Sequence, residues 1–154
     1  MKTTKIMNQI MVAFVFLLLP GNAFCQTDAE NHGHLTAINQ AIITHTQLIV
    51  SGEAKTRNDQ VTEYNETRRA LAEAKKTHGL LKKVIPEKSK SEAIIHHDNI
   101  DRFYASATAM ANSMLEDLKG ETPDVVKLKE HAKKLRDAID LAEKEQQELI
   151  KVTR

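Results

Sequence analysis

Cysteine, tryptophan and proline are scarce in this chain of 154 residues, which has one cysteine, no tryptophan and three prolines. Because Cys25 is the single cysteine, an internal disulfide, a thiolate metal site and a CxxCH haem attachment are all excluded. The formal net charge is +1, and no basic face suggests a nucleic-acid partner. The chain also lacks a Gly-rich phosphate loop, a GxSxG elbow and an HExxH motif, so we do not expect an enzyme.

Aromatic side chains are few. Residues 26–154 contain only three, which are Tyr64, Phe103 and Tyr104. The core must therefore be built from Leu, Ile, Val, Ala and Met, a composition that suits closely packed helices better than a β-sandwich. The same scarcity argues against a large planar cofactor such as haem.

A long apolar run occurs once, at the N-terminus, and it predicts export. Lys2 and Lys5 precede the unbroken apolar residues 10–19, and Pro20 ends the run. This is the pattern of a secretory signal peptide over residues 1–25, and the run is too short for a membrane span of ~20 residues. We therefore expect a periplasmic or secreted protein without a transmembrane segment.

The cleavage site has three interpretations. Cleavage after Cys25 fits the small residues Ala23 and Cys25, whereas cleavage after Ala23 leaves the cysteine close to the new N-terminus. The third interpretation is a lipid anchor on Cys25. A bacterial lipobox has a small residue before its cysteine, whereas this chain has Phe24, so a lipid anchor is disfavoured.

Few glycines and prolines interrupt the rest of the chain, and Gly52, Pro86 and the stretch 120–123 divide it into four segments. Apolar residues recur in each segment at spacings of three and four, which predicts amphipathic helices. The predicted helices are 34–51, 54–84, 90–119 and 123–152. Polar residues 26–33 are predicted to form a flexible tail. Short connections then predict an all-α, up-down-up-down four-helix bundle over 34–154, with a short first helix.

Each predicted helix has one stripe of mainly apolar residues. The first two stripes are Leu35, Ile38, Ile42, His45 and Ile49, and then Val61, Tyr64, Thr67, Leu71, Ala74, His78, Leu81 and Ile85. The third is Ala93, His96, Ile100, Phe103, Ala107, Met110 and Met114. The fourth is Val125, Leu128, Ala132, Leu135, Ile139, Ala142, Gln146 and Leu149, a strict heptad seam.

Three polar residues on these stripes are expected at one level of the bundle. His78 and His96 are equally far from position 87, and reflecting His96 through the last connection gives Gln146. Because an unpaired buried polar group costs ~1–3 kcal/mol, the three should hydrogen-bond to one another as a structural layer. The alternative is a site for Zn, Cu or Ni, which imidazole binds well, on His78 and His96.

Other histidines allow further metal hypotheses. His45, His131 and Met114 are expected towards the opposite end of the bundle, where they would suit Cu(I) or a b-type haem. Methionine at helical spacing is, however, usually core filler. The pair His32 and His34 would bind Cu(II) or Ni(II) loosely.

The sequence therefore favours an exported, non-enzymatic bundle without a cofactor, acting as a binding or structural module. Its partner would be an unidentified protein or a second copy. The alternative is a transition-metal binding protein that uses core and tail histidines, and haem b is a weaker third. Apolar residues outside the stripes are the candidates for a contact surface; they are Ile43, Val50, Ile94, Val126 and Ile150.

Overall fold

The computed structural model describes residues 28–119 and 122–153, and this part of the chain is helical without strands. The four long helices are α2 (Asp28–Ser51), α3 (Arg57–Leu81), α4 (Lys90–Leu118) and α5 (Val125–Thr153), with short 3₁₀ turns η1 (Lys82–Val84) and η2 (Glu87–Ser89). None of these helices is long and apolar enough to cross a membrane. The predicted signal peptide, its cleavage site and Cys25 lie outside the described residues.

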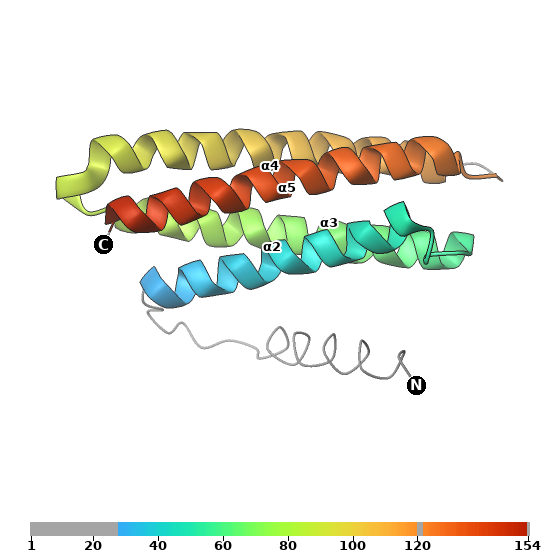
Figure 1. The fold of residues 1–154 in the computed structure, drawn as a ribbon, viewed down its shortest axis with the longest axis horizontal. Coiled ribbons are helices and arrows are strands. Elements are labelled where there is room, and N and C mark those ends of the chain that lie inside the picture. The colour runs from blue at the N-terminus through green and yellow to red at the C-terminus, as the bar shows by residue number, and fades with distance from the viewer. Residues whose placement is uncertain (1–27, 120–121, 154) are drawn as a thin grey trace.

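The four helices pack together lengthwise, as predicted for an all-α protein (Figure 1). The α2–α3 and α4–α5 connections lie at one end, and the α3–α4 connection lies at the other (Figure 1). Contacts fix the register of α3 against α4, because His78 meets His97 near one end and Arg57 donates to the Leu118 carbonyl near the other. These two helices therefore run in opposite directions.

Helix α2 is longer than the sequence predicted. It begins at Asp28 and has 24 residues, against 25 in α3, so it is not a short helix. Residues 28–33, expected in a flexible tail, form its first turns. Gly33 is an exposed residue inside the helix rather than its boundary, and the burial of Asn31 shows that these turns already pack on the bundle.

The α2–α3 connection is also longer than predicted. Gly52 adopts a φ of 80° after α2, the left-handed conformation that glycine accepts at a helix end. Helix α3 begins only at Arg57, because Thr56 and Asp59 form a reciprocal capping box. The Asp59 amide donates to Thr56 Oγ1 over 3.1 Å, and the Thr56 amide donates to Asp59 Oδ2 over 2.9 Å.

Most of the predicted stripes form the core, with α4 as the exception. On α2, α3 and α5 the residues at the centre of each predicted stripe are buried, although Val125 at the start of α5 is exposed. Helix α4 instead buries a face rotated from the predicted one. Its buried residues are Ala93, His97, Ile100, Tyr104, Ala107, Ala111, Met114 and Leu118.

Candidate functional site

A pair of histidines lies buried between α3 and α4. His78 Nε2 and His97 Nδ1 are 2.8 Å apart, and the ring centroids are 4.9 Å apart. The two side chains are only 1% and 2% exposed. The sequence predicted His96 as the partner of His78. That prediction was wrong by one residue, because α4 turns His97 rather than His96 towards α3.

Asp101 and Lys82 extend the pair to the surface. His78 Nδ1 lies 3.0 Å from Asp101 Oδ1, and Lys82 Nζ lies 2.6 Å from Asp101 Oδ2. An ionised carboxylate only accepts hydrogen bonds, so the proton of neutral His78 belongs on Nδ1. His78 Nε2 is then an acceptor, and His97 must donate to it from Nδ1. The His97 Nε2 lone pair remains outside this chain of bonds.

Both imidazoles are held in the neutral form. Burial lowers the pKa of His97 to about 4, and the neighbouring His78 and Lys82 act in the same direction. Burial also lowers the pKa of His78, although the Asp101 carboxylate opposes this effect. Partial burial acts to raise the pKa of Asp101, but the hydrogen bond from Lys82 and the nearby His78 outweigh it and leave that pKa below its usual value.

A second buried polar group lies beside the pair and joins α2, α4 and α5. The Tyr104 hydroxyl donates to Asn39 Oδ1 over 2.9 Å, and the Tyr104 ring meets the His78 ring edge-on with centroids 5.9 Å apart. Asn39 Nδ2 donates to Glu143 over 2.9 Å and to Gln146 over 3.4 Å. Burial raises the pKa of Tyr104, so its hydroxyl keeps the proton that it donates.

The predicted layer joins Gln146 to the two histidines, whereas the structure gives Gln146 other partners. Gln146 is buried at this end of the bundle, and it donates to Thr36 Oγ1 and to the His32 carbonyl, both on α2. The sequence reasoning missed Asn39 and Tyr104, although an asparagine placed between Ile38 and Ile42 was a signal for a buried amide.

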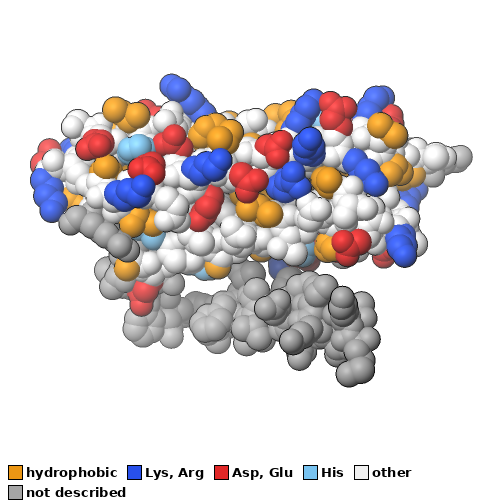
Figure 2. Space-filling view, viewed as in Figure 1, with side chains coloured by type: hydrophobic (Ala, Val, Ile, Leu, Met, Phe, Trp, Pro, Cys, Tyr) orange, Lys and Arg blue, Asp and Glu red, His pale blue; other side chains and the backbone are white. Residues whose placement is uncertain are grey.

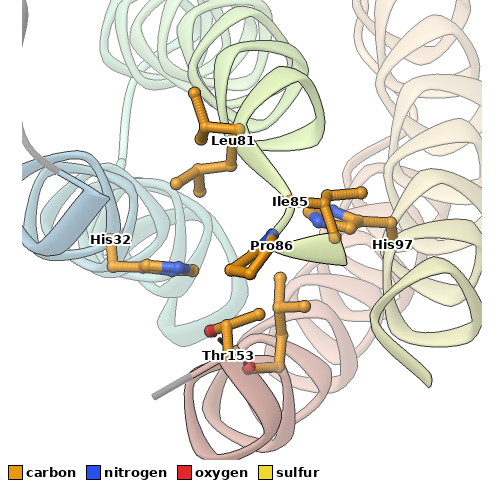
Figure 3. A pocket seen from close by; sticks show the side chains of 8 residues that line it. His32, Leu81, Ile85, Pro86, His97 and Thr153 are labelled. Atoms are coloured by element: carbon orange, nitrogen blue, oxygen red, sulfur yellow. Dashed lines mark hydrogen bonds between the residues drawn. The ribbon is translucent and has the colours of Figure 1, made fainter. Parts of the chain in front are cut away.

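A small cavity of about 20 Å³ lies next to the histidine pair. Its walls come from α2, from the α3–α4 connection, from α4 and from the end of α5, and Figure 3 shows His32 and His97 on different sides of it. The other lining residues are Leu81, Val84, Ile85, Pro86, Leu149 and Thr153. A space of this size accommodates about one water molecule.

The other candidate ligands have separate partners. His96 Nδ1 is 2.7 Å from Glu145, His45 Nδ1 is 2.6 Å from Glu63, and His131 Nδ1 is 2.6 Å from Asp117. Met114 is fully buried in the hydrophobic core. Within residues 28–119 and 122–153, no three His, Cys, Asp or Glu side chains form a group that could hold a metal ion.

A groove runs along the outer face of α4 and α5. It has a volume of about 360 Å³ and is lined by Phe103, Ser106 and Met110 from α4, and by Lys134, Asp137, Ala138 and Leu141 from α5. On the face shown in Figure 2, charges of both signs alternate with scattered apolar side chains. Of the apolar residues predicted for a contact surface, Ile94 and Val126 are exposed, Ile43 and Val50 pack against the core, and Ile150 is half-buried.

No protein-family model, curated protein or solved structure matches this chain. Its function must be inferred from its own residues.

Proposed function

We propose that this chain is an exported, up-down-up-down four-helix bundle that works without catalysis as an interaction module and associates with a second copy of itself. The observation that carries the proposal is the groove between α4 and α5. Export is supported by the sequence of residues 1–25, which has the pattern of a secretory signal peptide.

The spacing of the groove residues suits a helical partner. Phe103, Ser106 and Met110 follow one another at three and four residues along α4, and Lys134, Asp137 and Leu141 do the same along α5. Two parallel ridges with a depression between them are the surface into which the ridge of another helix packs. The small side chain of Ala138 lets such a helix approach closely.

The charges in the groove favour a second copy as the partner. Lys134 and Asp137 lie one turn apart on the same helix and both line the groove. A two-fold axis passing between them would place each lysine opposite the aspartate of the other copy. A symmetric dimer uses one patch on both subunits, so a patch that carries both signs is complementary to itself.

Sedimentation equilibrium of the purified protein tests this proposal. We expect a reversible monomer–dimer equilibrium that L141E shifts to monomer, because a carboxylate would be buried without a partner in the dimer. V126E is the matched control, since Val126 is 79% exposed but lies outside the groove. A monomeric protein at every concentration, or dimers equally weakened by both substitutions, would overturn the proposal.

Cell fractionation tests export separately. We expect the mature chain outside the cytoplasm, and its intact mass distinguishes cleavage after Ala23, cleavage after Cys25 and a lipid-modified Cys25. Full-length protein confined to the cytoplasm would contradict export without affecting self-association.

One observation supports transition-metal binding as a second candidate. Asp101 contacts His78 Nδ1, which leaves Nε2 unprotonated, and metal-binding histidines are commonly oriented by a carboxylate in this way. A metal ion on this nitrogen would replace the hydrogen bond that His97 Nδ1 now makes to it. His97 would supply a second imidazole nitrogen. The test is equilibrium dialysis against Cu, Zn or Ni, one metal at a time. On this candidate, the original protein and H96N should each keep one bound ion, and H78Q should keep none. Protein that emerges from dialysis without metal would contradict this candidate.

The separate carboxylate partners of His45 and His131 lend no support to haem between them.

A further inference from the structure

Outside the buried pair, three histidines contact carboxylates across helix interfaces. His45–Glu63 joins α2 to α3, and His96–Glu145 and His131–Asp117 join α4 to α5. The His45, His96 and His131 side chains are 14%, 20% and 23% exposed, so water reaches each of them.

The α3–α4 interface differs from these, because two histidines face each other across it. A positive charge on one imidazole would therefore meet the other histidine as well as Asp101. The remaining ionisable groups near the pair are Lys82 at the end of α3, His32 on α2 and Tyr104 on α4. From α5, the neighbouring cavity wall is formed by the uncharged Leu149 and Thr153. Asp101 already binds Lys82, which limits its ability to stabilise an additional proton.

Of the interfaces between neighbouring long helices, α3–α4 is also the least extensively packed. Neighbouring helices pack most extensively between α4 and α5, less between α2 and α3, and least between α3 and α4. The connection between α3 and α4 consists of two short 3₁₀ turns around Pro86 instead of a single tight turn. The small cavity lies immediately below this connection.

We infer that acid opens the bundle along one seam, between α3 and α4 at the end that holds His78 and His97, while the α2–α3 and α4–α5 hairpins stay folded. Opening brings water to both rings, and a hydrated imidazole binds a proton more readily than a buried one. The exposed Leu80 and Ile94 flank the buried Leu81 and Ala93 in sequence, so opening would join them into one apolar surface.

Hydrogen–deuterium exchange across pH 7 to 4, corrected for the intrinsic exchange rate, tests this inference on the purified protein. If opening takes up one proton, the open population increases about tenfold for each unit that the pH falls. This holds between the pKa of the imidazole in the open state and its pKa in the closed state. We expect protection to fall first in residues 74–81 and 93–104. Protection in α5 and in the α2–α3 connection should change little over the same range.

Two substitutions identify the sensor. H97N keeps an amide N–H where His97 Nδ1 donates but removes the titrating group, so we expect it to abolish the acid-dependent loss of protection. H96N is the matched control, because His96 is the adjacent residue and uses the same nitrogen towards Glu145. We expect H96N to leave the acid response of α3 and α4 intact. If H97N does not fold, H78Q serves the same purpose from the other side.

Three results would overturn the inference. They are equal loss of protection in all four helices, unchanged protection between pH 7 and 4, and an acid response that persists in both H97N and H78Q. None of these results depends on whether the protein dimerises through the α4–α5 groove, because sedimentation at the same pH values reports dimerisation separately.

Discussion

His96 and His97 are neighbours in the sequence, yet they belong to two regions of the molecule with opposite chemistry. His96 faces α5, is partly exposed and contacts Glu145, whereas His97 faces α3, is buried and contacts another histidine. One step along a helix turns a side chain by about 100°, which is enough to move it from one interface to the next. Burial and hydrogen-bond partner, rather than residue type, therefore distinguish the chemistry of the two positions.

The comparison predicts that the buried region makes stability depend on pH. Burial lowers the pKa of His97 from the ordinary 6.5 to about 4. Between these pH values the unfolded chain binds a proton that the folded chain does not bind, so stability falls as the pH falls from 6.5 to 4. A difference of this size is worth about 3 kcal/mol of unfolding free energy. Urea denaturation at several pH values measures it.

The same measurement on two variants isolates the His97 contribution from that of the carboxylates. H97N should lose most of the pH dependence between 6.5 and 4, whereas H96N should retain it. Equal pH slopes in the two variants would show that the two regions do not differ in the way their geometry indicates.

A double-mutant cycle gives the next largest effect. H97L alone leaves His78 Nε2 buried without its donor, which should cost about 2 kcal/mol at pH 7. H78L together with H97L removes both polar groups, and the double variant should be close to the original protein in stability or above it. Urea denaturation of the single and double variants gives the coupling energy, and simple additivity would exclude a direct bond between the rings.

The contrast between these neighbours also shows where the sequence was insufficient. On α4, two heptad stripes share Ala93, Ile100, Ala107 and Met114, and they differ in the residues between. The predicted stripe used Phe103. The structure buries Tyr104 instead, since Asn39 on another helix accepts the hydrogen bond from its hydroxyl. Periodicity within one helix cannot reveal a partner that another helix supplies.

Helix α5 was predicted more accurately than α4, because its sequence offers one apolar stripe and not two. Its heptad seam has no competing stripe, and Leu128, Leu135, Ile139, Gln146 and Leu149 are all buried. The register across the last connection was accurate to one residue, because His96 lies against Glu145 where Gln146 was expected. Reflection through a connection succeeds when the helix ends are correct, and the start of α3 was predicted three residues too early because the Thr56 capping box was missed.

A smaller effect distinguishes the two aromatic neighbours on α4. Y104F removes the hydroxyl that bonds to Asn39 and leaves a buried amide oxygen without its donor, which should cost about 1.5 kcal/mol at any pH between 5 and 8. F103L, at the half-buried neighbouring position, is the control and should cost less. Thermal denaturation followed by circular dichroism measures both. A larger loss for F103L would mean that the apolar groove matters more to the fold than the buried bond.

The smallest effect is expected in the partly exposed region, at the contact between His131 and Asp117. H131N keeps a donor at the Nδ1 position and removes only the ability to become positively charged. Because exposed ion pairs contribute little, the substitution should change the unfolding free energy by less than about 1 kcal/mol at pH 7. Added salt should reduce the loss by screening. Urea denaturation at two salt concentrations makes the measurement. The size of the effect is the informative part, because H131N should cost less than H97L, which leaves a buried nitrogen without its donor. If H131N costs as much as H97L, the partly exposed contact and the buried contact contribute alike to stability, and burial is not what separates them.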